Sequence, residues 1–250
     1  MNPSPFQTPI FLDQHAFIVG TTGGGKTTRT KLQIKARIYD LMRYRVSPKA
    51  YKIIIIDTKP ITFGMKDDEG FYYDLVQQYN GLLLREYTAF PWNDESTYLF
   101  VYRPLREDIN PQNFAEFFMY MANLQMSTET GRVQMPYLIV IDELVDIAAD
   151  DRTRLRYMHG FTRIMAEGRA SLQTIWTETQ SPRFIFGDIR RLTTARFIFR
   201  LPDPEDRKYM RDVTGDTRVR DPIRDPYGFY YSNDQVPNAS VPIYFSGVNP

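Results

Sequence analysis

The chain has 250 residues, of which 42% are hydrophobic and 24% are charged, as is usual for a globular protein. Its net charge is +1, so any contact with a polyanion must come from a local patch or from a pore built by several subunits. The chain has no cysteine, which excludes disulfides and thiolate chemistry, and neither an export signal nor a membrane-spanning run of ~18 apolar residues is expected.

Residues 1–14 contain three prolines and little periodicity. They fit an arm that packs on the domain or on a neighbouring subunit, and they fit a disordered tail equally well. The tail at 216–250 is expected to be a C-terminal extension with two edge strands around a proline-bounded turn. Between these ends we expect one α/β domain, so that 1–250 forms a single unit.

The next segment, His15 to Leu32, contains the phosphate-binding P-loop pattern G-x-x-x-x-G-K-T between an apolar strand and a helical sequence. Glycines allow successive backbone N–H groups to point at an anion, and the helix N-terminus adds its dipole. Lys26 is expected to reach the β- and γ-phosphates and Thr27 to bind Mg²⁺. The pattern therefore predicts ATP binding by Gly20, Thr21, Thr22, Gly23, Gly24, Gly25, Lys26, Thr27 and Thr28.

Four consecutive isoleucines at 53–56 predict a buried parallel strand that ends in Asp57 and Lys59. Residues 61–98 are less regular, with a possible helix at 71–79 and strands at 82–87 and 97–104. A helix begins at Pro111 after an Asn110 cap. Residues 126–136 are expected to form a polar loop.

The apolar strand 138–141 ends in Asp142 and Glu143, which is a Walker B pattern. In this pattern the aspartate holds Mg²⁺ and the following glutamate polarises the attacking water. The glutamate favours a motor ATPase over a GTPase switch or a small-molecule kinase.

A basic helix is expected at 151–167, followed by a strand that ends at Gln180. A polar side chain at the end of a strand beside Walker B can sense the γ-phosphate, and we assign Gln180 that role. A further strand at 195–201 and a capped helix at 203–215 complete the predicted sheet and its covering helices.

The order of these motifs resembles the FtsK–HerA superfamily of ring-forming DNA-pumping ATPases. The discriminating segments are "IIIIDTKP" at 53–60 and "EGRASLQTIWTETQSP" at 167–182, which are similar to the second strand and the sensor strand of that family. The likeness covers roughly residues 15–213. One departure is that "TETQSP" lacks the arginine that often follows the sensor glutamine.

The resemblance implies a RecA-like fold with a mostly parallel sheet, a hexameric ring and double-stranded DNA in its channel. A neighbouring subunit would then complete each site with an arginine, for which family position favours Arg169, with Arg163 and Arg196 as alternatives. The DNA would be held by nonspecific phosphate contacts. Candidate loops for them are 59–66, the loop at Gly131 and Arg132, and 181–191 with Arg183, Arg190 and Arg191.

No winged-helix, membrane-anchor or barrel domain of other members is expected in these 250 residues, and at this length the chain most resembles the genome-packaging ATPases of membrane-containing viruses. The expected partner is then a capsid vertex or portal protein, and the expected location is the host cytoplasm or the virion vertex, or the cytoplasm if the protein is cellular. Two alternatives stay open: a plasmid-transfer or DNA-segregation motor, and a nucleotide-dependent ring or clamp that does not pump.

Overall fold

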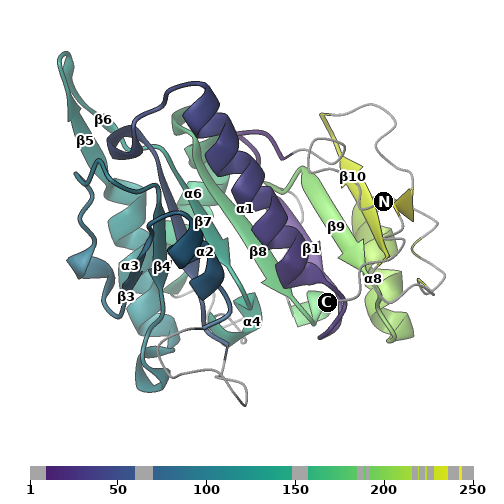
Figure 1. Cartoon of the computed structure of the whole chain (residues 1–250). Coiled ribbons are helices and arrows are strands. Elements are labelled where there is room, and N and C mark those ends of the chain that lie inside the picture. The colour runs from purple at the N-terminus through teal and green to yellow at the C-terminus, as the bar shows by residue number, and fades with distance from the viewer. Residues whose placement is uncertain are drawn as a thin grey trace.

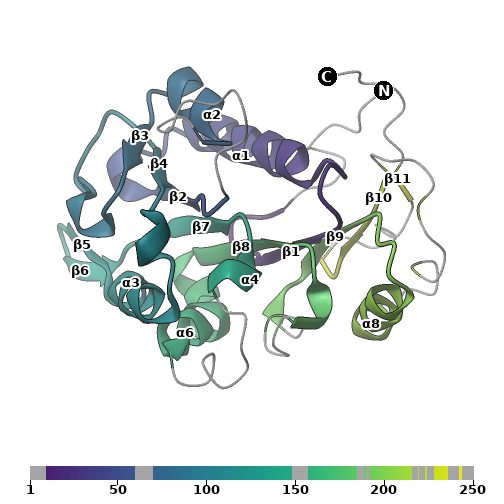
Figure 2. The same ribbon diagram turned by 90° about the horizontal axis from the view of Figure 1, so that it is seen from below.

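A computed structural model of the chain describes residues 10–59, 70–147, 157–184, 189, 192–215, 219, 223, 228–235 and 242–243. Its centre is a twisted sheet with helices on both faces (Figures 1 and 2). Within these residues, no helix is both long and apolar enough to cross a bilayer.

The central sheet has nine strands in the order β11-β10-β9-β1-β8-β7-β2-β4-β3. The strands from β9 to β3 are parallel, and β10 and β11 are antiparallel additions at one edge. This confirms the predicted mostly parallel sheet with C-terminal edge strands. The bounds are β1 Ala16–Val19, β2 Lys52–Ile56, β3 Leu82–Leu84, β4 Leu99–Tyr102, β7 Tyr137–Ile141, β8 Gln173–Thr179, β9 Ala195–Phe199, β10 Phe229–Asn233 and β11 Pro242–Ile243.

The helices form two layers on opposite faces of the sheet (Figure 2). One layer holds α1 (Lys26–Arg43) and α2 (Tyr73–Gln78). The other holds α3 (Pro111–Asn123), α4 (Leu144–Ile147), α6 (His159–Glu167) and α8 (Pro204–Thr214). The predicted caps are present, because the side chains of Asn110 and Asp203 accept hydrogen bonds from the first turns of α3 and α8. Of the helix expected at 151–167, α6 lies within the described residues, whereas 151–156 lies outside them.

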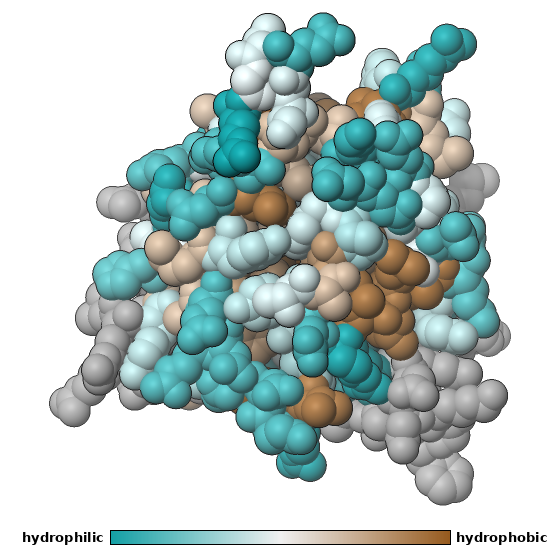
Figure 3. Space-filling model, turned by 90° about the vertical axis from the view of Figure 1, so that its left-hand side faces the viewer, coloured by the Kyte–Doolittle hydropathy of each residue, from teal (hydrophilic) through white to brown (hydrophobic). Residues whose placement is uncertain are grey.

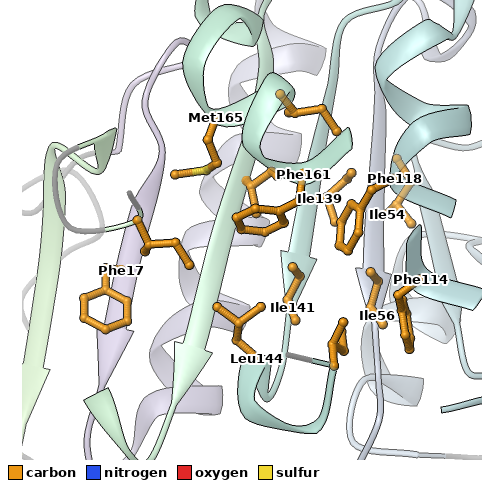
Figure 4. Close-up of a cluster of buried hydrophobic side chains, with 14 of the residues drawn as sticks. Phe17, Ile54, Ile56, Phe114, Phe118, Ile139, Ile141, Leu144, Phe161 and Met165 are labelled. Carbon is orange, nitrogen blue, oxygen red and sulfur yellow. The ribbon is translucent and has the colours of Figure 1, made fainter. Parts of the chain in front are cut away.

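The apolar core lies in two clusters, one on each face of the sheet. In the cluster under α3 and α6, Phe118 and Phe161 pack edge to face above Ile139 (Figure 4). A Cβ on Gly160 would stand 2.4 Å from the backbone of Phe118, so α6 needs glycine there to approach α3 closely. Each large apolar side chain buried in this way contributes about 1.5–3 kcal/mol.

Residues 10–14 pack against the domain. Arg37 of α1 donates hydrogen bonds to the carbonyl oxygens of Ile10 and Phe11 at 3.0 and 2.8 Å. The side-chain amide of Gln14 donates to Asn233 on β10 at 2.8 Å. This part of the expected arm therefore joins α1 to the edge of the sheet, and residues 1–9 lie outside the described residues.

The prediction of a polar loop at 126–136 is wrong, because these residues belong to an antiparallel hairpin. Strands β5 (Gln125–Thr128) and β6 (Gly131–Gln134) pair along their length and project beyond the sheet (Figure 1). The Thr128 hydroxyl donates to the carbonyl oxygen of Gly131 at 2.9 Å across the turn. Both strands are largely exposed, so they carry little of the apolar alternation by which a strand is recognised in a sequence.

His15, directly before β1, gives the fold a pH dependence that can be measured. It is fully buried, and its Nδ1 accepts a hydrogen bond from the Ile175 backbone N–H at 3.0 Å. Burial, assisted by Arg169, lowers the pKa of His15 from 6.5 to about 4. Between these values the unfolded chain binds more protons at this position than the folded chain, so its contribution to stability is lost as the pH falls through that window.

We expect wild type to lose roughly 3 kcal/mol more unfolding free energy between pH 7 and pH 4 than a His15→Asn variant, which keeps an acceptor near the Nδ1 position. Urea unfolding at both pH values measures this difference. His159 is exposed, so His159→Asn is the matched control and should follow wild type. Parallel pH profiles for wild type and His15→Asn would contradict the assignment.

Candidate active site

The loop from Gly20 to Thr27 joins β1 to α1, as the P-loop pattern predicts. Gly20, Gly23 and Gly25 have φ values of +155°, +73° and +90°, where L-residues with side chains are strained. A Cβ on Gly20 would stand 2.4 Å from the Cβ of Phe199, so β9 packs directly on the loop. Gly25 is the N-cap of α1, and the helix dipole therefore points at the loop.

Lys26 lies inside this loop. Its ammonium group donates to the carbonyl oxygens of Gly20 and Thr21 at 2.5 and 3.0 Å. Burial lowers the pKa of Lys26, while nearby carboxylates, Glu178 first among them, act in the opposite direction. A positive charge that the backbone of the loop holds in place in this way is suited to contact an anion bound in the loop. The remaining predicted loop residues differ in exposure: Gly24 is buried, Thr21, Gly25 and Thr27 are half-buried, and Thr22, Gly23 and Thr28 are exposed.

The two predicted Mg²⁺ ligands, Thr27 and Asp142, are brought to one point by Lys59. The Lys59 ammonium donates to the Thr27 hydroxyl at 3.0 Å and to Asp142 Oδ1 at 2.5 Å. Asp142 Oδ2 is buried and has no hydrogen-bond partner among the described groups. A hydroxyl and an orphaned carboxylate oxygen are hard donors of the kind Mg²⁺ takes, together with water and phosphate oxygens. The residues present therefore fit this metal.

Glu143 and Gln180 also meet beside the P-loop. The Gln180 backbone N–H donates to Glu143 Oε1 at 3.3 Å, and the Thr22 hydroxyl donates to Gln180 Oε1 at 2.6 Å. These contacts arise because β8 lies between β1 and β7. The end of β8 therefore stands between the P-loop and the Walker B acids and contacts both. Burial raises the pKa of Glu143, and hydrogen bonds from Thr179 and Gln180 oppose this rise. Glu143 Oε2 is buried with no hydrogen-bond partner among the described groups, as expected of an oxygen available to a reactant.

Sequence reasoning missed two residues of this network, Tyr72 and Glu178. The Tyr72 hydroxyl lies 3.1 Å from Asp142 Oδ1 and 3.3 Å from Glu178 Oε1. Burial and the neighbouring Asp142 raise the pKa of Glu178 to about 8, which favours its protonated form near neutral pH. Glu178 could have been found from its place two residues before Gln180. Tyr72 had no signal, because it enters from an irregular segment and meets the site only in the fold.

The candidate arginines lie away from the P-loop of their own chain. Arg169 belongs to a 3-10 turn (Gly168–Ser171) that precedes β8, whereas the site lies after the strands, so the two occupy opposite ends of the sheet. Its guanidinium contacts Asp13 at 3.0 and 3.2 Å and is 41% exposed. Arg163 donates to Asn123 at 2.8 Å, and Arg196 is buried against Asp234 at 2.7 Å. Arg169 is therefore accessible to a second subunit but not to its own nucleotide site.

The candidate DNA loops are distributed over the molecule. Arg132 lies on the exposed strand β6 of the hairpin. Arg183 forms ion pairs with Asp203 and Asp206 at 2.6 and 2.7 Å, which partly neutralise its charge. Residues 60–66, Arg190 and Arg191 lie outside the described residues.

No protein-family model matches this chain. Among curated proteins, the DNA translocase FtsK of Helicobacter pylori (strain J99) is 26% identical over 215 residues, which is 85% of this chain and 23% of that protein. FtsK of Campylobacter jejuni (strain 81-176) is 24% identical over 211 residues, covering 84% of this chain and 21% of its own length. The chain thus spans less than a quarter of the curated relatives it matches.

Solved structures share the fold. The genome packaging NTPase B204 of Sulfolobus turreted icosahedral virus 2, in complex with ATP-γS, matches 93% of this chain and 97% of its own with a TM-score of 0.61 at 15% identity. ATPases 2 and 3 of EssC from Geobacillus thermodenitrificans match 90% of this chain and 39% of theirs, with a TM-score of 0.55 at 13% identity. These likenesses confirm the predicted RecA-like fold. Together with the sequence similarity to FtsK, they show that this chain has a P-loop fold and is similar to ATPases of the FtsK–HerA type.

Proposed function

We propose that this chain uses ATP hydrolysis to move along double-stranded DNA, and that its task is to package a viral genome into a preformed capsid. The observation that carries the proposal is the sequence similarity to DNA translocases over 85% of the chain. A span of this length necessarily includes the Walker B acids and the sensor strand. The acting unit is the RecA-like domain formed by residues 1–250, with 1–14 and 216–250 as its extensions.

The site supports hydrolysis by in-line attack of water on the γ-phosphate of ATP. Lys26 neutralises charge on the β- and γ-phosphates, and Thr27 and Asp142 would hold Mg²⁺, which would neutralise further phosphate charge. Glu143 accepts the proton of the attacking water, and Gln180 senses the γ-phosphate from its contact with Thr22. These roles follow from the donor and acceptor character of each group and from its place beside the P-loop.

The packaging role is supported by the size and fold that this chain shares with B204, a genome packaging NTPase. A packaging motor needs a ring, here taken as a hexamer, and a docking partner at the capsid vertex or portal. It would work in the host cytoplasm or at the virion vertex. Co-sedimentation of the assembled ring with empty capsids tests the docking step.

ATPase measurements with and without duplex DNA test the proposal as a whole. We expect duplex DNA of any sequence to stimulate turnover, and the stimulation to fall steeply between 50 and 200 mM salt, because phosphate contacts release counterions. Single-stranded DNA of equal length is the control for nonspecific polyanion effects. A turnover rate unaffected by duplex DNA at low salt would contradict a translocase and favour a clamp or assembly role.

A further inference from the structure

A cleft of about 730 Å³ opens beside the nucleotide site, at the ends of β2, β4 and β3. Among the described residues, four cationic side chains line it against two carboxylates, so its lining is net positive. Pro104, Leu105 and Ile109 supply apolar wall. The charged lining residues are Lys59, Arg85, Arg103, Arg106, Asp57 and Asp146.

The cleft is separate from the place where the phosphates of ATP are expected. The P-loop follows β1, and β8 and β7 lie between β1 and β2. Three strand spacings of ~4.8 Å put the end of β2 about 14 Å from the end of β1. No residue of the P-loop is among the described residues that line the cleft, so the arginines of the cleft lie outside the expected phosphate site.

The cleft contacts the catalytic network through the three residues that directly follow β2. Asp57 is paired with Arg103 at 3.3 Å, the Thr58 hydroxyl donates to Asp146 at 3.1 Å, and Lys59 contacts Asp142 at 2.5 Å. An anion in the cleft attracts Lys59 and Arg103, and so competes with Asp142 and Asp57 for them. Binding in the cleft is therefore coupled to Lys59, the side chain that contacts both Thr27 and Asp142.

The position of the cleft also suits a large partner. Arg106 and Leu105 at its edge are exposed, and Arg85 is half-buried at the end of β3, the edge strand of the sheet. Polar side chains cover much of the face at that end of the molecule, with smaller apolar areas between them (Figure 3). The exposed Arg106 lets one charge of a polyanion meet the cleft from solvent.

We propose that this cleft binds a backbone phosphate of duplex DNA and passes its occupancy to the ATPase site through Asp57, Thr58 and Lys59. This inference rests on the proposed DNA-translocating function and names the contact that this function needs. The chemistry recognised is a phosphate group, which free inorganic phosphate released by hydrolysis also carries. The two sources are separated by experiment.

The experiment compares two double variants that remove the same charge: Arg85→Gln with Arg106→Gln in the cleft, and Arg43→Gln with Arg211→Gln on α1 and α8. Binding of a fluorescent duplex to the full chain is measured by anisotropy over a salt series, with a nonhydrolysable ATP analogue present. The loss of one phosphate contact lowers the slope of log K against log salt by about 0.9 and weakens binding roughly 8-fold at 0.1 M salt. We expect this for the cleft pair only.

Replacing the same two arginines with lysine separates loss of charge from loss of structure. Lysine keeps a point charge for phosphate, so Arg85→Lys with Arg106→Lys should retain most of the wild-type slope. The inference is overturned if the double glutamine variant in the cleft binds duplex with the wild-type slope, or if the double variant on α1 and α8 weakens binding equally. The proposed function stands in either case. Wild type that binds no duplex at any salt overturns both. If the cleft pair binds duplex as wild type does, but its ATPase activity is no longer inhibited by inorganic phosphate, the cleft holds free phosphate and the DNA contact is overturned.

Discussion

Replacing Glu143 with glutamine should lower kcat for ATP hydrolysis by about 10²- to 10⁴-fold, the usual contribution of a general base. The amide keeps the size of the side chain and can still accept the Gln180 N–H, which now lies 3.3 Å from Oε1. It cannot take a proton from water. ATP binding, measured by equilibrium titration of a fluorescent analogue, should therefore stay within a few-fold of wild type.

Glu167→Gln is the matched control, because the same chemical change is made at a side chain that is 71% exposed at the C-terminal end of α6. It should hydrolyse ATP at the wild-type rate. If Glu143→Gln kept a kcat within several-fold of wild type, the base would be a group other than Glu143. A large loss of ATP binding would instead indicate that Glu143 shapes the site.

Replacing Arg169 with alanine should lower turnover of the assembled ring by about 10³-fold or more, if this side chain stabilises the transition state in a neighbour's site. The reason to expect action between subunits is geometric, because Arg169 and the P-loop lie at opposite ends of the same sheet. Removing Arg169 also breaks its contacts with Asp13, so loss of activity alone does not separate the two roles.

Mixed rings separate them. Arg169→Ala subunits keep the P-loop, and Lys26→Ala subunits keep the arginine, so each supplies what the other lacks. In a 1:1 mixture about a quarter of the head-to-tail interfaces join an intact P-loop to an intact arginine, and activity should return to a comparable fraction of wild type. Arg163→Ala and Arg196→Ala, tested alone and in the same mixtures, examine the alternative arginines. A mixture no more active than its two components excludes Arg169 as the residue acting in trans.

The local elements of this fold could be predicted where one physical requirement dominates the sequence. A run such as Ile53–Ile56 has to be buried on both faces, and only a parallel strand covered by two helical layers provides that. The P-loop needs glycine at left-handed positions, and Asn110 and Asp203 need the amides of a helix start. The hairpin at 125–134 could not be predicted in this way, because its exposed strands are held by backbone pairing and carry no apolar pattern.

The residues alone predict the chemistry: a phosphate loop, a metal-binding threonine and aspartate, a glutamate for water, and a polar sensor at the end of a third strand. They can do so because each group is specified by its neighbours within a few residues. Which groups meet depends on the fold. The order of β1, β8, β7 and β2 brings Tyr72, Glu178 and Lys59 to Asp142, and it leaves Arg169 at the opposite end of the sheet. Those distances depend on how strands far apart in the chain are ordered, and the packing of the whole core sets that order.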